Sequence, residues 1–265
     1  AKKRPASKDN VVAQARGKGK PSAPLAKRVW ENVKSLAGAV LIYLVIKTFL
    51  MEAFRIPSGS MIPSLLIGDW LFVNKVAYGP HLPFTRLRLP GYTTPGRGDI
   101  VVFVSPYQPD MAEAGDDPTP TLVKRLVGMP GDTLYMREGL LHVNGIPQRQ
   151  GYAASVNPKG DPKERTPLMD WQHRIGLTGT RFGAPPTEPN LDHWGPLLIP
   201  QDHYFMMGDN RYASKDSRYW GVVPLGNVRG RPMFVYYSFV GGGESDRPLP
   251  AITDIRWRRL GHWIR

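Results

Sequence analysis

Apolar and polar positions follow a different pattern in successive stretches of this 265-residue chain. Residues 1–27 are rich in Lys, Arg, Ala, Ser, Gly and Pro, a composition typical of disorder. Residues 36–46 are uncharged and mostly apolar, and the apolar pattern resumes after Lys47. The whole stretch 35–54 is close to the length that a helix needs to cross about 30 Å of hydrocarbon. We therefore predict a transmembrane helix over 35–54 after a basic, disordered tail over 1–34.

Two other interpretations of the apolar stretch stay open, a buried helix of a soluble protein and a cleaved signal peptide. Lys47 argues for the first, but it lies two turns from the distal end, where its ammonium can snorkel outward. The long basic region before the stretch argues against the second, as does the lack of small residues three apart near Met51-Glu52-Ala53. An uncleaved anchor is the favoured interpretation.

From Arg55 onward, short β-type runs alternate with Gly and Pro. The chain holds 28 Gly and 27 Pro without a repeat, which excludes collagen and favours a turn-rich β protein. We predict a mainly β fold: an all-β domain with long loops over 55–265, carrying an inserted loop-rich β subdomain at about 145–200. The predicted strands are Trp70–Val76, Asp99–Ser105, Leu122–Val127, Thr133–Met136, Leu140–Val143, Tyr204–Met207 and Pro232–Phe239.

Charge is spread unevenly along the chain. The net charge is +13, and residues 1–34 hold ten Lys and Arg against two acidic residues, so +8 lies in the tail. A basic segment before an apolar span predicts a cytoplasmic N-terminus, with the remaining chain on the outer side. A nucleic-acid binder would fit the tail and nothing else. The basic C-terminus is either a short helix with Trp257, Leu260 and Ile264 on a face toward the membrane, or the end of the last strand.

Several classes of chemistry lack the residues they need. The chain has no cysteine, which excludes disulfides, thiolate metal sites and a cysteine nucleophile. Its six histidines show no HExxH spacing, and neither GxSxG nor SxxK occurs. Zinc proteolysis and the common serine-nucleophile motifs therefore have no support.

Three segments have an unusual composition. Residues 54–63 (FRIPSGSMIP) hold two serines between prolines directly after the apolar span, and are more apolar than an ordinary linker. Residues 122–132 (LVKRLVGMPGD) put Lys124 in an apolar strand. Burial there would lower its pKa and make it a base, whereas an edge strand would turn it to solvent. Residues 208–221 (GDNRYASKDSRYWG) are either a solvated turn or a loop packed by internal hydrogen bonds.

Together these segments resemble the conserved boxes of bacterial type I signal peptidase (leader peptidase), a membrane-anchored Ser–Lys protease. PSGSM, KRLVGMPGD and GDNR…SKDSRYWG match in order and in position after an anchor. The resemblance covers about residues 35–240 and leaves much of 145–200 unmatched in detail. It implies a β-rich catalytic domain, without cofactor or metal, that removes signal peptides from exported preproteins. It also implies a place in the bacterial cytoplasmic membrane with the catalytic domain on the periplasmic side.

The resemblance also implies residue roles. Ser60 matches the nucleophile and Lys124 the general base, with an oxyanion hole formed by the Ser58 hydroxyl and the Ser60 N–H. The supporting positions are Ser214, which orients the lysine through a hydrogen bond, the pair Asp216 and Arg218, and the structural positions Arg125, Asp209 and Asn210. Shallow apolar pockets for small residues at substrate positions −1 and −3 would be lined by Phe54, Ile56, Met61, Leu65, Leu122 and Val123. Leu122 stands where many members have an aromatic residue.

Two other functions stay open. One is a dedicated Ser–Lys peptidase that matures a pilin or another single substrate, which an assay on several preproteins would distinguish. The other is a noncatalytic, membrane-anchored binding module, which would not need Ser60, Lys124 and Ser214 together. The expected partners are exported preproteins and the phospholipid bilayer, with no nucleic acid, and the sequence predicts no oligomeric state.

Overall fold

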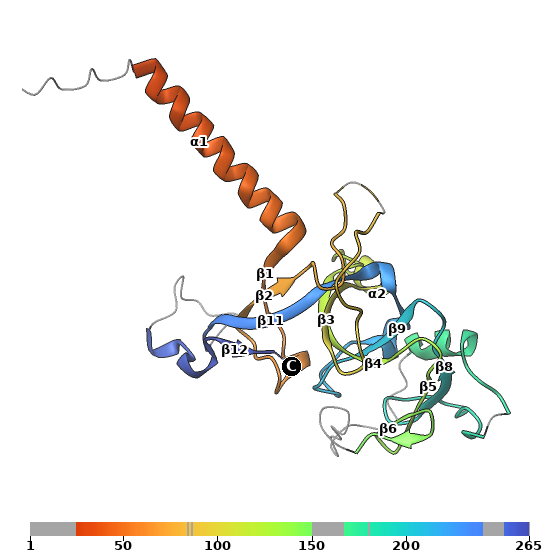
Figure 1. Ribbon diagram of the computed structural model, residues 1–265. Coiled ribbons are helices and arrows are strands. Elements are labelled where there is room, and N and C mark those ends of the chain that lie inside the picture. The colour runs from red at the N-terminus through yellow and green to blue at the C-terminus, as the bar shows by residue number, and fades with distance from the viewer. Residues whose placement is uncertain are drawn as a thin grey trace, which may run out of the picture. The chain divides into compact units, whose positions relative to one another are not determined.

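The computed structural model describes residues 25–83, 85, 87–149, 167–179, 181–240 and 252–264 (Figure 1). Helix α1 covers Leu25–Val45 and continues as a π-helical turn, η1, over Ile46–Leu50. The helical stretch Lys27–Leu50 contains an 18-residue window with a mean hydropathy of 1.8, and it is long and apolar enough to cross a membrane. Residues 25–34, predicted to belong to a disordered tail, are therefore helical, while residues 1–24 lie outside the described part.

The distal end of the predicted span is a strand and not a helix. β1 covers Met51–Arg55 and pairs antiparallel with β2, Asp69–Asn74. Its side chains alternate between exposed and half-buried positions, the period-two pattern of a strand at a sheet surface. The chain therefore passes from the apolar helix into the β domain without a linker.

The rest of the chain confirms the predicted all-β domain. The strands are β3 (Ile100–Val104), β4 (Thr121–Gly128), β5 (Thr133–Arg137), β6 (Leu140–Val143), β7 (Ile146–Pro147), β8 (Trp194–Leu198), β9 (His203–Met207), β10 (Val223–Pro224), β11 (Val228–Ser238) and β12 (His262–Trp263). Short helices are α2 (Pro109–Glu113), α3 (Ser217–Trp220) and the 3-10 turns η2 (Gly59–Met61), η4 (Pro167–Arg174), η5 (Leu225–Asn227), η6 (Ile252–Asp254) and η7 (Trp257–Arg259).

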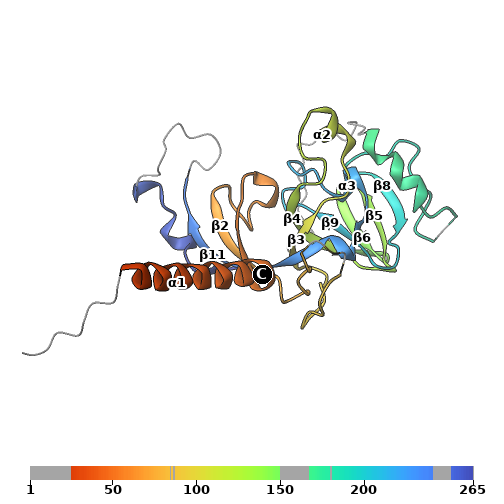
Figure 2. The same ribbon diagram turned by 90° about the horizontal axis from the view of Figure 1, so that it is seen from above.

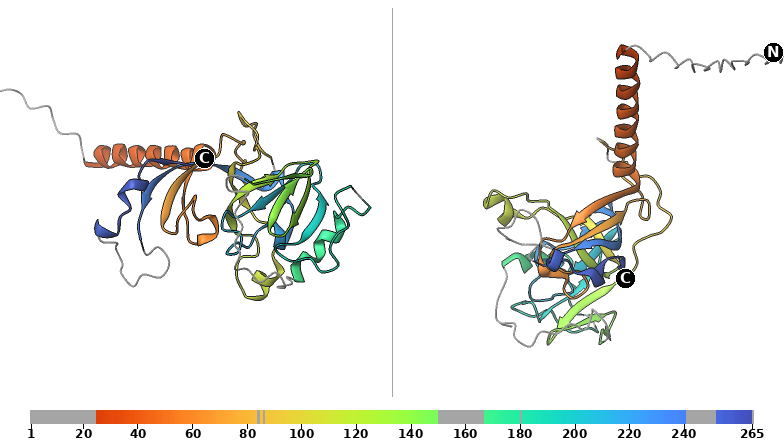
Figure 3. Two further views of the ribbon diagram at one scale, coloured as in Figure 1. Left: turned by 90° about the horizontal axis from the view of Figure 1, so that it is seen from below. Right: turned by 90° about the vertical axis from the view of Figure 1, so that its left-hand side faces the viewer.

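Within the described residues the strands form two antiparallel sheets. The larger has the order β1-β2-β11-β3-β4-β9-β10, with β12 paired to β11, and the smaller has the order β7-β6-β5-β8. β11 belongs to both parts of the larger sheet, because Arg231–Ser238 pairs with β2 and Val228–Gly230 pairs with β3. In Figures 2 and 3, β5, β6 and β8 lie beyond β4 and β9, on the side away from β2.

All seven predicted strands exist, with ends that differ by a few residues. β8 lies in the predicted loop-rich insertion and was missed, since Gly195 and Pro196 interrupt its apolar pattern. Of the two alternatives left open for the C-terminus, the short helix is wrong. Trp257–Arg259 is a single 3-10 turn, β12 follows it, and Ile264 packs into the core with 8% of its surface exposed.

Candidate active site

Ser60 lies in a short, tightly held turn between β1 and β2. The prolines at 57 and 63 flank it, and the 3-10 turn η2 covers Gly59–Met61. Asn210, from the loop after β9, clamps this turn: its backbone N–H donates to the Ser60 carbonyl at 3.1 Å, and its Nδ2 donates to the Gly59 carbonyl at 3.1 Å. Ser60 is 8% exposed. The turn is thus fixed by a loop about 150 residues away in sequence.

Lys124 reaches Ser60 from the middle of β4. Its Nζ lies 2.7 Å from Ser60 Oγ, and the residue is buried. Burial lowers the pKa of Lys124 to about 8. Arg218 lowers it further, whereas Asp216 and Asp209 act in the opposite direction. The two side chains that the sequence singled out therefore form a buried hydroxyl–amine pair, and its amine is partly neutral close to neutral pH.

A second contact holds the serine turn against β4. Arg125, next to Lys124 in the strand, binds the Asp209 carboxylate through two nitrogens at 2.8 and 2.7 Å. Arg125 Nη2 also donates to Ser64 Oγ at 3.0 Å, and Ser64 Oγ donates to Asp209 at 2.5 Å. All three side chains are thus joined where β4, the loop after β9 and the chain after Ser60 meet. Ser64 was not singled out from the sequence, because a lone serine after a proline gives no signal for such a contact.

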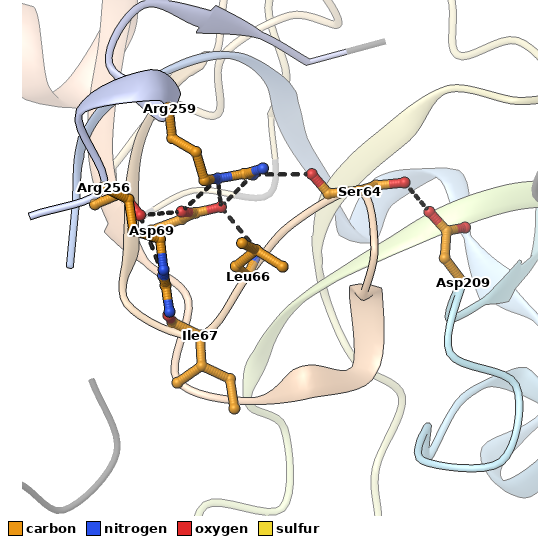
Figure 4. A network of polar contacts seen from close by, with 8 residues as sticks. Ser64, Leu66, Ile67, Asp69, Asp209, Arg256 and Arg259 are labelled. Atoms are coloured by element: carbon orange, nitrogen blue, oxygen red, sulfur yellow. Dashed lines mark hydrogen bonds and ion pairs between the residues drawn. The ribbon is translucent and has the colours of Figure 1, made fainter. Parts of the chain in front are cut away.

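The C-terminal segment braces the same loop from its other end (Figure 4). Arg259 Nη2 lies 2.5 Å from Asp69 Oδ2 and donates to the Ser64 carbonyl at 3.1 Å. Arg256 Nη1 donates to the Ile67 carbonyl at 2.8 Å. Asp69 is fully buried. The basic C-terminus, predicted to lie on a membrane or to end a strand, thus places two of its arginines on the loop that follows Ser60.

Behind the lysine lies a buried ion pair. Asp216 caps α3 and binds Arg218 Nε and Nη2 at 2.8 Å each, and it accepts the backbone N–H of Gly208 at 3.0 Å. Burial alone would raise the pKa of Asp216, but Arg218 outweighs it and holds the pKa below its usual value. Both side chains are almost fully buried. The polar loop 208–221 is therefore packed through its own hydrogen bonds, as one of the two sequence interpretations had it.

Ser214 differs from the expectation. Its hydroxyl is buried and makes no hydrogen bond to Lys124 among the described residues, but it acts on Asp216, whose pKa it helps to lower. Ser214 also packs against Gly208. A Cβ at Gly208 would lie 2.2 Å from Ser214 Oγ and 2.5 Å from the Ser60 carbonyl oxygen. Gly208 is thus a site residue that the sequence analysis left without a role. Glycine is required at position 208 because Ser214 and the Ser60 carbonyl approach it closely in the fold, and the sequence around Gly208 does not show this approach.

Ser58 lies close to Ser60, as expected, but the residues expected to line apolar substrate pockets are mostly buried. The Ser58 hydroxyl lies 3.5 Å from Ser60 Oγ. Ile56, Met61 and Leu65 are core residues, with 4%, 1% and 0% of their surface exposed, so they do not form open pocket walls. Phe54 and Val123 pack on this cluster and stay half-exposed, whereas Leu122 packs with a different cluster on the other face of β4.

The arrangement contains no candidate metal centre. Among the described residues, no group of three or more His, Cys, Asp or Glu side chains could hold an ion.

Comparisons with known proteins show the family of this chain. A family model described as signal peptidase, peptidase S26, matches residues 7–237. Signal peptidase I of Pseudomonas aeruginosa is 36% identical over 82% of this chain and 76% of its own length. That of Pseudomonas fluorescens is 36% identical over 79% and 72%. A probable signal peptidase I-2 of Synechocystis is 33% identical over 94% and 93%. The chain belongs to the signal peptidase family, peptidase S26, and is a peptidase of that family.

Proposed function

We propose that this chain is a membrane-bound serine endopeptidase that removes N-terminal signal peptides from exported preproteins through a Ser60–Lys124 dyad. The observation that carries the proposal is the 2.7 Å contact between Ser60 Oγ and a lysine amine whose pKa is lowered by burial. A serine hydroxyl is a weak nucleophile unless a neighbouring base accepts its proton.

In the first step, neutral Lys124 accepts the Ser60 hydroxyl proton as Oγ attacks the scissile carbonyl. The negative charge that develops on the carbonyl oxygen is stabilised by the Ser60 N–H and the Ser58 hydroxyl. The resulting ammonium then gives the proton to the leaving amine as the peptide bond breaks. The products of this step are an ester on Ser60 and a free new N-terminus.

In the second step, neutral Lys124 accepts a proton from water as the water attacks the ester carbonyl. Collapse of this intermediate breaks the ester bond, and the proton returns to Ser60 Oγ. Enzyme and base leave the cycle unchanged. The neighbouring carboxylates Asp209 and Asp216 are each held by an arginine, so neither competes with Lys124 for the serine proton.

We assign substrate selection to Phe54 and Val123, the two expected pocket residues that stay half-exposed and pack on one apolar cluster. Phe54 on β1 and Val123 on β4 pack over the same cluster as Ile56 and Met61. The substrate is expected to carry small residues at positions −1 and −3, as the resemblance to signal peptidases implies.

The apolar helix supplies the membrane anchor in this proposal. We place the N-terminus in the cytoplasm and the β domain on the periplasmic side of the bacterial inner membrane, because the +8 tail precedes the span. The site then lies on the side where exported preproteins emerge.

The proposal is tested by cleavage of a preprotein by the full chain and by Ser60→Ala and Lys124→Ala. Both changes should reduce turnover by several orders of magnitude, because each removes one member of the dyad. Lys215→Ala is the matched control, since Lys215 is a half-exposed lysine in the polar loop 208–221 and pairs with Asp110. Near-normal cleavage by either dyad variant, or equal losses for Lys124→Ala and Lys215→Ala, would refute the assignment.

A further inference from the structure

A groove of about 510 Å³ opens beside the last turn of the apolar helix. Residues from distant parts of the chain line it, among them Lys47 near the helix end, Glu52 on β1, Lys75 and His81 after β2, and Arg229 on β11. Pockets that bind small molecules typically have volumes in this range.

The charges in this groove are mostly positive. Three cationic side chains, Lys47, Lys75 and Arg229, line it together with one carboxylate, that of Glu52. Glu52 is already engaged, since its Oε2 lies 2.7 Å from Lys75 Nζ. Within the described residues, neither Lys47 nor Arg229 has a carboxylate partner. Two positive charges therefore remain uncompensated.

The surroundings of His81 are cationic as well. Burial lowers the pKa of His81, and Arg229, Arg88 and Lys75 lower it further. Its Nε2 lies 2.9 Å from the Gly226 carbonyl, which acts in the opposite direction. Burial also lowers the pKa of Arg229, and Arg88 adds to this effect. The positive charges of Arg229 and Arg88 thus repel each other, and an anion beside Arg229 would relieve this repulsion.

We propose that this groove binds a phosphate group, supplied in the membrane by the headgroup of an anionic phospholipid. Guanidinium and ammonium groups are the usual donors to phosphate oxygens. The lipid source follows from position, because Lys47 and Thr48 belong to the last turn of the apolar span and lipid phosphates lie where such a span ends. The lipid source, though not the phosphate site, rests on the membrane anchorage of the proposed function. Free phosphate is the alternative source of the same chemistry.

The test is a titration of the detergent-purified full chain with fluorescently labelled short-chain phosphatidylglycerol, read by anisotropy. Arg229→Gln should weaken Kd about fivefold, the factor that corresponds to about 1 kcal/mol for one cationic side chain at an anionic membrane surface. Arg229→Lys should restore most of the affinity, which a merely misfolded variant would not do. Arg231→Gln is the matched control: it removes the same charge from the same strand, where Arg231 faces Asp99 outside the groove.

Equal Kd values for wild type and Arg229→Gln, or equal losses for Arg229→Gln and Arg231→Gln, would overturn the site. Inorganic phosphate should displace the labelled lipid only at far higher concentration, and displacement at an equal concentration would overturn the lipid source. Cleavage of a soluble peptide is measured in parallel. A chain that cleaves the peptide but shows no dependence on Arg229 refutes the groove alone. A chain that binds lipid through Arg229 but never cleaves refutes the catalytic proposal alone.

Discussion

At the scale of single residues, Lys124 must be buried to act as a base, and burial makes its charged form costly. Its pKa of about 8 means that about one-tenth of the amine is neutral at pH 7 and most of it above pH 9. We therefore expect kcat/KM on a soluble peptide to rise about tenfold from pH 6 to pH 7 and to level off above pH 9. A profile measured from pH 6 to pH 10 checks this. A midpoint near 6.5, the ordinary value for histidine, would contradict a lysine base.

The same burial predicts a pH-dependent stability. The pKa of Lys124 is lower in the folded chain than in the unfolded chain, so protonation opposes folding. The penalty is complete below pH 8 and disappears as the pH rises toward 10.5. Lys124→Met should then be more stable than wild type at pH 7, by up to about 3 kcal/mol, and should lose this advantage by pH 10. Chemical denaturation at both pH values measures the difference, with Lys215→Met, at a half-exposed lysine, as the control. An advantage that does not change with pH would contradict the linkage.

Ser214 and Gly208 give a paired prediction. Ser214→Ala removes a buried hydroxyl that makes no bond to Lys124 and only assists Arg218 in lowering the pKa of Asp216, so the melting temperature should change little. Gly208→Ala should displace the Ser60 turn and reduce kcat about a hundredfold, since small misplacements of reacting groups have effects of this size. The double variant should stay as inactive as Gly208→Ala, because the clashes with the Ser214 Cβ and the Ser60 carbonyl remain. Recovery of activity in the double variant would contradict the packing argument.

At the scale of elements, period-two patterns between Gly and Pro were enough to predict most strands. They failed where another pattern overlapped. β1 was assigned to the anchor because Met51, Ala53 and Phe54 extend its apolar run, and only the pairing with β2 distinguishes a strand there. The roles of Ser60 and Lys124 were assigned by the resemblance of three segments to the conserved boxes of signal peptidase. The contacts that hold them, such as Arg259 with Asp69 and Ser64, join residues far apart in sequence, and no local pattern encodes such a pairing.

The contacts of Arg259 with Asp69 and the Ser64 carbonyl, which join the C-terminal segment to the loop after Ser60, are predicted to contribute several kcal/mol to the free energy of unfolding. Asp69 is fully buried, so Arg259→Ala leaves an unpaired buried carboxylate and should destabilise the chain by about 3–5 kcal/mol. Arg258→Ala, at an exposed neighbouring position, should cost less than about 1 kcal/mol. Denaturation midpoints compare the two. Adding Asp69→Asn to Arg259→Ala should recover part of the loss, and equal effects of Arg258→Ala and Arg259→Ala would rule this contribution out.

At the scale of the whole molecule, the lack of a linker limits how far the site can lie from the anchor. β1 begins directly after Leu50, and Ser60 follows ten residues later. Even a fully extended chain of this length spans no more than about 36 Å. Lys75 shortens the path further, because its backbone N–H donates to the Leu50 carbonyl at 2.9 Å and its Nζ donates to the Lys47 carbonyl. A substrate that is held in the membrane close to its cleavage site would therefore place its scissile bond at about the same distance from the membrane as Ser60.

This position of the site near the membrane surface is useful only if the β domain lies on the outer side. Because the chain has no cysteine, its orientation can be tested by labelling single introduced cysteines. A single cysteine can be introduced by Tyr107→Cys, at a residue 61% exposed in the β domain, or by Ser7→Cys in the basic tail. A membrane-impermeant maleimide should label Tyr107→Cys in intact spheroplasts, and Ser7→Cys only after lysis, because the positive tail is retained in the cytoplasm. The unmodified chain should stay unlabelled throughout. The reverse labelling order would place the catalytic residues in the cytoplasm, where translocated preproteins do not emerge, and would refute both the orientation and the argument from the position of the site.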